Sequence, residues 1–128
     1  APDGGRAAHV LARVGEPALL PFIKNWAAKT KTGSTPFHMI AHSKRPDAVA
    51  AALELGADIA VVDDAGMTAL HFLADHGGPV AMFRALIDAG ADPQQEMTGA
   101  AYGYKVRTTA IDIAKRWNDT EAIRVLGG

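Results

Sequence analysis

The chain has 128 residues, of which 48% are hydrophobic, and its 13 Lys and Arg residues nearly balance its 14 Asp and Glu residues. This length suits one compact domain or one short repeat array, and the balanced charge gives the chain no global attraction to nucleic acid. The absence of cysteine excludes a disulfide framework, a zinc finger and a cysteine nucleophile. No stretch approaches the roughly 20 apolar residues that span a bilayer. We therefore expect no membrane partner, and the balanced charge leads us to expect no nucleic-acid partner.

Two short strings recur in the same order along the chain, which indicates internal repeats. The stretch 35–41 (TPFHMIA) returns 33 positions later as 68–74 (TALHFLA), and Gly-Ala-Asp at 56–58 returns 34 positions later at 90–92. A weaker copy of the first string begins at Arg6, and another begins at Thr109 after a longer interval. The period is therefore close to 33 residues, with an insertion before the last copy.

Each repeat predicts two short helices joined by a tight turn. Thr35, Thr68 and Thr109 are expected as N-caps of the first helices, and Asp112 reaches back to its cap as the acid of a capping box. The expected helix breaks are Gly15, Lys44-Arg45, Gly77-Gly78 and Asn118, and the second helices are expected to start at Pro17, Pro46, Pro79 and near Thr120. Pro21 should kink or shorten the first of these second helices.

Polar excursions separate the helix pairs. We expect hairpin fingers at 26–34, 59–67 and 93–108, and the third of them carries the insertion with Tyr102 and Tyr104. The acid pair Asp63-Asp64 is expected to face solvent on the second finger. The remaining aromatic residues are expected in the core; these are Phe22, Trp26, Phe37, Phe72 and Phe83.

The two strings resemble the Thr-Pro-Leu-His-x-Ala signature of the ankyrin repeat. The resemblance covers nearly the whole chain and implies an all-α ankyrin-repeat solenoid with short β-hairpin fingers. The resemblance further implies that the solenoid is one domain of about four units, at approximately 6–34, 35–67, 68–108 and 109–128. The first and last of these units are expected as irregular caps. In this family the signature histidine holds neighbouring backbone, a structural role that the resemblance gives to His9, His38 and His71.

The resemblance also implies a concave face, formed by the fingers and the first helices, that binds a protein partner. Carried over by position, its contact residues are Lys31, Ser34, His42, Asp64, Met67, Asp75, His76, Tyr102, Tyr104, Lys105, Arg107, Arg116 and Trp117. The two tyrosines are expected to touch the partner. Trp117 is either an interface anchor or a cap over the last repeat, and both readings stay open.

We therefore expect a non-catalytic protein-interaction module without a cofactor and monomeric on its own, because no nucleophile motif or phosphate loop occurs. Among similar bacterial proteins, immunity, inhibitor and accessory proteins of enzymes are candidate functions. One alternative is an ankyrin fragment of a larger secreted effector or enzyme. Another is metal binding through His38, His42, His71 or His76. If Ala1 is the end left by a leader peptidase, the periplasm is the expected compartment.

Overall fold

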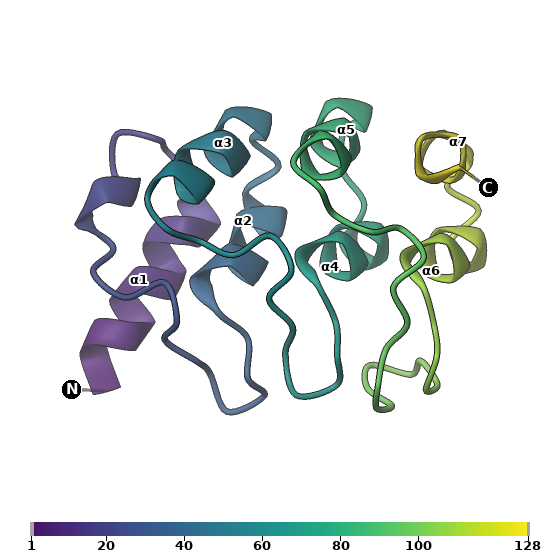
Figure 1. Ribbon diagram of the computed structural model, residues 1–128, viewed down its shortest axis with the longest axis horizontal. Helices are drawn as coiled ribbons and strands as arrows, with labels where there is room; N and C mark the ends of the chain where they lie inside the picture. Colours follow the sequence, from purple (N-terminus) through teal and green to yellow (C-terminus); the bar gives the residue numbers. More distant parts are fainter. Residues whose placement is uncertain (1, 128) are drawn as a thin grey trace.

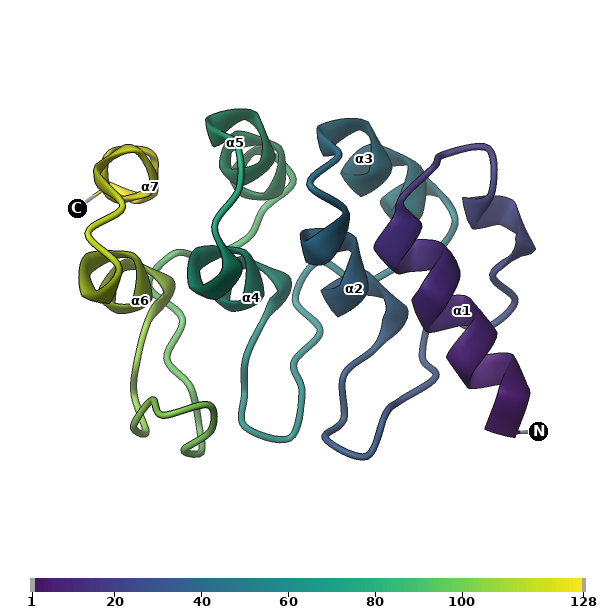
Figure 2. The same ribbon diagram turned by 180° about the vertical axis from the view of Figure 1, so that it is seen from behind.

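The computed structural model describes residues 2–127, and it arranges their helices in two stacked rows. In Figure 1 the helices α2, α4 and α6 form one row, α3, α5 and α7 form a second row above it, and loops project below. α1 lies at one end, packed on α2 (Figure 2). The elements are α1 (Pro2–Val14), the 3-10 helix η1 (Leu20–Phe22), α2 (Pro36–Ser43), α3 (Pro46–Glu54), α4 (Ala69–His76), α5 (Val80–Asp88), α6 (Ala110–Arg116) and α7 (Thr120–Leu126).

The first helices α2, α4 and α6 all begin at the expected threonine caps. The Thr68 hydroxyl accepts the His71 N–H, and the Thr109 hydroxyl accepts the Asp112 N–H. In return the Asp112 carboxylate accepts the Thr109 N–H, so the capping box predicted there is confirmed. These reciprocal bonds satisfy donors that the start of a helix leaves without partners.

The signature histidines link each unit to the next. The backbone N–H of Thr35 can only donate, so His38 Nδ1 accepts it at 3.0 Å and His38 Nε2–H donates to the Met67 carbonyl at 2.7 Å. His71 repeats the pattern with the Thr108 carbonyl at 3.2 Å. Nε2 of His9 likewise lies 2.8 Å from the Ser34 carbonyl. Each imidazole therefore fixes the point where the following finger re-enters a helix.

All four predicted breaks between paired helices are confirmed. Gly15, Lys44, Gly77 and Asn118 each take a positive φ, between 54° and 77°. Gly15 also permits close packing, because a Cβ there would lie 2.3 Å from the Cβ of Ser43.

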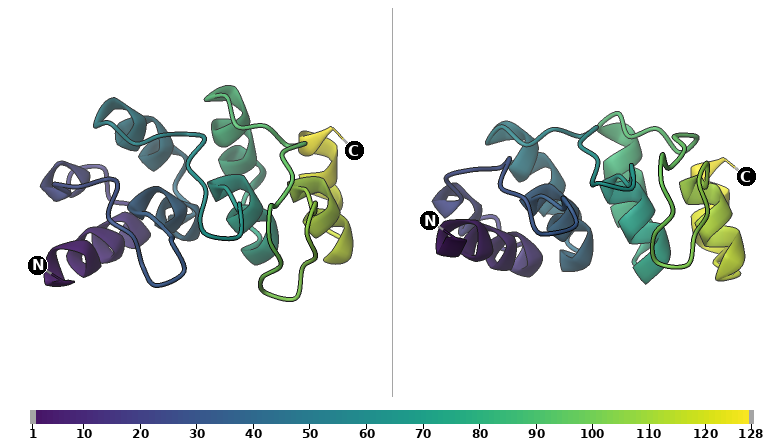
Figure 3. Two further views of the ribbon diagram at one scale, coloured as in Figure 1. Left: turned by 60° about the horizontal axis from the view of Figure 1, so that its bottom comes forward. Right: turned by 90° about the horizontal axis from the view of Figure 1, so that it is seen from below.

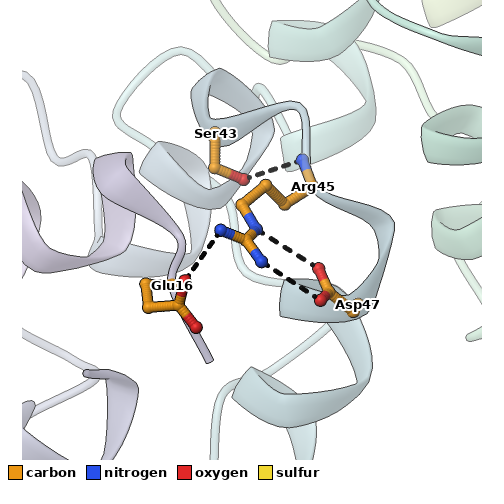
Figure 4. Close-up of polar contacts among 4 residues, drawn as sticks. All are labelled: Glu16, Ser43, Arg45 and Asp47. Atoms are coloured by element: carbon orange, nitrogen blue, oxygen red, sulfur yellow. Dashed lines mark hydrogen bonds and ion pairs between the residues drawn. The ribbon is translucent and has the colours of Figure 1, made fainter. Parts of the chain in front are cut away.

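An ion-pair cluster reinforces the joint between the first two units (Figure 4). The Arg45 guanidinium donates to Glu16 at 2.9 Å and lies 3.4 Å from Asp47, while the Ser43 hydroxyl accepts the Arg45 N–H. Glu16 follows α1, and Arg45 is the N-cap of α3. The cluster therefore ties the turn of the first unit to the turn of the second.

The first unit departs from the expected helix pair. In place of a second α-helix starting at Pro17, the chain makes turns and then the three-residue η1, within which Pro21 lies. Proline cannot donate to a helical hydrogen bond, and its ring obstructs the preceding turn. As a result Phe22, which the sequence placed in the core, is 65% exposed, whereas Leu20 and Ile23 are buried.

The fingers are hairpin-like turns rather than β-hairpins, which corrects the expected strands. No described residue lies in a named strand, and the single bridge between Ala101 and Tyr104 is isolated. The second finger is closed by the Asp63 N–H donating to the Met67 carbonyl at 3.0 Å. Asp63 is buried, contrary to expectation, because its carboxylate accepts the N–H groups of Ala65 and Met67 inside the turn.

Successive finger tips are joined by backbone hydrogen bonds, and the fingers project from one side of the helices (Figure 3). The Asp64 N–H donates to the Thr32 carbonyl at 3.0 Å, and the Thr98 N–H donates to the Ala65 carbonyl at 2.9 Å. A Cβ at Gly66 would lie 2.6 Å from the Thr98 nitrogen. Glycine is thus required there for the second and third tips to touch.

Candidate functional site

A groove of about 410 Å³ lies where the three fingers meet the first helices. Its walls come from three consecutive parts of the array: the first finger, α2 with the end of the second finger, and α4 with the third finger. The lining residues are Thr30, Thr32, Ser34, Met39, His42, Met67, Phe72, Asp75, His76 and Tyr102. The groove therefore depends on the stacking of the units, because no single unit supplies it.

One wall of the groove is formed by rings from neighbouring units that pack against one another at an angle. The ring centroids of His42 on α2 and His76 on α4 are 4.2 Å apart, and the His42 ring meets the edge of Phe72 at 5.9 Å. His42 is the penultimate residue of α2, and His76 is the last residue of α4. Packing of α2 on α4 brings the two rings side by side, although the residue 33 positions after His42 is Asp75.

The imidazole of His42 is held in its neutral form. Its pKa is lowered to about 4, mainly by burial and in addition by the neighbouring His76 and Arg13. The Asp75 carboxylate acts in the opposite direction but does not outweigh them. Near neutral pH the groove wall therefore offers an uncharged ring rather than a cation.

Tyr102 forms the outer edge of the groove. Its side chain is 56% exposed, and its ring meets Phe72 edge-on with centroids 6.2 Å apart. Its backbone takes a positive φ of 55°. The insertion therefore places an accessible ring over the groove, where the sequence expected a contact residue.

Tyr104 has a different place, which corrects the expectation that it is presented to a partner. Its side chain is only 6% exposed, and its hydroxyl donates to Asp75 Oδ1. Burial, followed by the bond to Asp75, raises the pKa of this phenol, so it keeps its proton. The Arg116 guanidinium covers the ring at 4.8 Å and donates to the Gly103 carbonyl. Tyr104 therefore anchors the enlarged finger to α4 and α6.

Trp117 joins the same network while remaining accessible. Its indole N–H lies 2.9 Å from the Tyr104 hydroxyl and 3.2 Å from Asp75 Oδ1, yet the side chain is 58% exposed. Trp117 also lines a second hollow together with Asp75 and His76. One edge of the ring is thus structural, and the rest of it faces solvent.

A third hollow lies at the finger tips. It is lined by residues of all three fingers, among them Lys31, Asp64 and Tyr102. Farther along the third finger, Lys105 and Arg107 are exposed, and Arg107 pairs with Glu96 at 3.3 Å. The charged finger residues therefore surround the groove instead of lining it.

The groove brings six of the thirteen predicted contact residues together: Ser34, His42, Met67, Asp75, His76 and Tyr102. Two of the six offer little side chain to a partner, because Ser34 and Met67 are buried. Sequence reasoning missed Met39 and assigned Phe72 only to the core. Each follows a signature histidine directly, and that shared position is the signal that could have identified them.

Comparison with known families agrees with this architecture. A family model described as ankyrin repeats in three copies matches residues 8–97. The chain belongs to the ankyrin-repeat family. Ankyrin repeats are in general protein–protein interaction modules. No curated protein matches the chain.

Two further observations concern other ligands of this ankyrin protein. Within residues 2–127, no group of three or more His, Asp or Glu side chains is arranged to hold a metal ion. Of the helices described, none is both long and apolar enough to cross a bilayer. His38 and His71, two of the residues in the metal alternative, have both ring nitrogens engaged by backbone groups.

Proposed function

We propose that this ankyrin protein binds a protein partner through the groove and acts without catalysing a reaction. The observation that carries the proposal is the groove itself, which is continuous across three units and edged by the exposed ring of Tyr102. The exposed ring of Trp117 lies in the second hollow, which shares Asp75 and His76 with the groove. Tyrosine and tryptophan are enriched among residues that dominate the energy of interfaces.

The charges around the groove support recognition of a defined partner. Exposed Lys31 stands on the first finger, Asp64 on the second and Lys105 on the third, so the sign of the charge alternates along the array. Alternating charges fix the register and orientation of a partner more than they add affinity. A partner with the complementary order of charges fits this surface.

For the class of partner, we propose an enzyme that this protein inhibits or accompanies, as small bacterial ankyrin arrays do. The structure of the groove is compatible with that role, because its polar side chains include no nucleophile paired with a base. The His42 ring contacts His76 and Phe72, and neither histidine makes a hydrogen bond to a serine or threonine hydroxyl among the described residues.

The proposal is tested with partners captured on the intact protein and then purified. Replacing Tyr102 and His76 together by Ala should weaken binding by about 2 kcal/mol, roughly thirtyfold in Kd. The matched control is Arg84→Ala on α5, an exposed change in the other helix row. If the control weakens binding and the groove variant does not, the surface is assigned incorrectly. Adding the protein to the captured enzyme then reports inhibition directly.

A further inference from the structure

The chemistry of the groove selects among the possible side chains of a partner. Its rings lie at steep angles to one another: Tyr102 meets Phe72 at 76°, and His42 meets Phe72 at 79°. Phe72 is buried among these rings, and the Tyr102 ring is exposed to a ligand. Ring faces carry partial negative charge and attract cations.

Asp75 supplies the carboxylate of the groove. Among the lining residues only Asp75 is acidic, and none is lysine or arginine. Both internal bonds to Asp75, from Tyr104 and from Trp117, are made to Oδ1. Within the described residues Oδ2 has no hydrogen-bond partner, so one carboxylate oxygen remains available to a ligand.

The other polar groups of the groove can accept hydrogen bonds. His42 makes no hydrogen bond within residues 2–127, and its neutral imidazole presents one acceptor nitrogen. Thr30 and Thr32 also line the groove, and their hydroxyls lie 3.1 Å apart. A ligand group that is rich in donors is therefore complementary to these walls.

The arginine side chains near the groove do not occupy the place of this ligand. Arg116 is placed over the Tyr104 ring and is bonded to the Gly103 carbonyl, and Arg13 lies on α1 outside the lining. Burial, followed by His76 and Arg13, lowers the pKa of His42, so the His42 ring itself adds no positive charge to the groove.

We propose that the groove receives the positively charged side chain of an arginine or lysine on a basic segment of the partner protein. This inference rests on the proposed function and adds the chemistry of the contact. The cation lies against the exposed ring of Tyr102 and donates hydrogen bonds to Asp75 Oδ2.

The test uses small probes that isolate the side chain. The whole chain, labelled with ¹⁵N, is titrated with N-acetyl-arginine amide, in which neither terminus is charged, and amide shifts are followed by NMR. We expect saturable shifts at His42, Asp75, His76 and Tyr102. The citrulline analogue has nearly the same shape without the charge and should bind at least about fivefold more weakly. N-acetyl-lysine amide should shift the same amides.

Two variants of Tyr102 separate a ring contact from a general effect. Tyr102→Phe keeps the aromatic face and should bind the arginine probe nearly as well as the unchanged protein. Tyr102→Ala should weaken binding about fivefold or more. Both changes affect an exposed finger residue and should leave the helices intact.

The outcomes distinguish this inference from the proposed function. Equal binding of the arginine and citrulline probes, or shifts confined to residues outside the groove, would overturn the cation contact. If the probes fail while the double groove variant still loses the captured partner, the proposed function stands and only the cation contact falls. If the double variant keeps the partner, the proposed function falls as well.

Discussion

At the scale of single residues, the buried histidines determine how the protein responds to acid. Burial lowers the pKa of His38 and of His71 below the ordinary value of 6.5, and bonds to the Met67 and Thr108 carbonyls oppose this only in part. Protonation would also place a hydrogen on Nδ1, where each ring accepts a threonine N–H. Both effects favour the neutral ring in the folded protein.

We therefore predict that acid destabilises the fold from about pH 6.5 downward. As the pH falls through 6.5, His38 and His71 bind protons in the unfolded chain but not in the folded protein, so the free energy of unfolding decreases. Each site contributes at most about 1.4 kcal/mol per pH unit. Urea unfolding between about pH 5 and pH 8 measures the slope. His71→Gln should lower stability at pH 8 but flatten this slope, and an unchanged slope would contradict the assignment.

The threonine caps give a second prediction at this scale. Thr68→Ala should cost about 1 kcal/mol of unfolding free energy, because the His71 N–H loses its acceptor. Thr68→Ser keeps the hydroxyl and is the matched control. The midpoints of urea unfolding, compared at an unchanged m-value, measure the stability of both variants. Partner binding should change only as far as the fraction of folded protein changes.

At the scale of elements, helices were easier to predict than fingers. Caps and breakers act locally, so Thr68, Pro46 and Gly77 were enough to locate helix ends. The burial of Asp63 was not expected, because an acid pair in a polar turn suggests solvent exposure, whereas its carboxylate accepts the N–H groups of Ala65 and Met67 inside the turn. The long-range bond between Tyr104 and Asp75 has no periodic signal in the sequence, so its role as an anchor appeared only in three dimensions.

Contact between finger tips should make Gly66 more sensitive to substitution than Gly90. An added Cβ there meets the Thr98 backbone at 2.6 Å, whereas a Cβ at Gly90 meets nothing within 4 Å. Both residues have a positive φ, which costs about 1–2 kcal/mol for alanine. We predict that Gly66→Ala lowers the unfolding free energy by more than Gly90→Ala, as measured by urea denaturation. Equal losses would mean that the tips separate readily.

The anchor of the enlarged finger can be tested by removing one oxygen. Tyr104→Phe deletes the hydroxyl that joins Asp75 to the Trp117 indole, and it should cost about 1–2 kcal/mol of stability. Amide hydrogen exchange should become faster in residues 98–106, and the fluorescence of Trp117 should change. Tyr102→Phe is the control, because the Tyr102 hydroxyl makes no hydrogen bond within residues 2–127. Slow exchange throughout the Tyr104 variant would contradict the anchor.

At the scale of the whole molecule, the order of stacking was predictable and the groove was predictable only in part. The period of 33 places corresponding helices side by side, so the rows of α2, α4 and α6 and of α3, α5 and α7 follow from the repeat. The depth of the groove depends on which residues the fingers fold inward. That is decided by packing across units, as the buried Met67 and the exposed Tyr102 show.

Stacking in one dimension predicts that the array unfolds unevenly. α7 packs on α5 and α6 at one end, whereas α4 packs on α2, α5 and α6 in the interior. Leu126 on α7 and Leu73 on α4 are both buried, and replacing either by Ala removes about 2–5 kcal/mol of packing energy. In a linear array each unit contacts only its neighbours, so a loss of packing energy at one end need not destabilise the units at the other end.

We therefore expect the two variants to differ in where they unfold, although the chemical change is the same. Leu126→Ala should accelerate amide exchange in α6 and α7 and leave α2 and α3 nearly as protected as before. Leu73→Ala should accelerate exchange across α2 to α7, because both neighbouring interfaces lose a partner. Hydrogen exchange followed by NMR or mass spectrometry distinguishes the patterns. If both variants lose protection uniformly, the array folds as one cooperative unit, and a partner in the groove would then stabilise every helix equally rather than mainly those that line it.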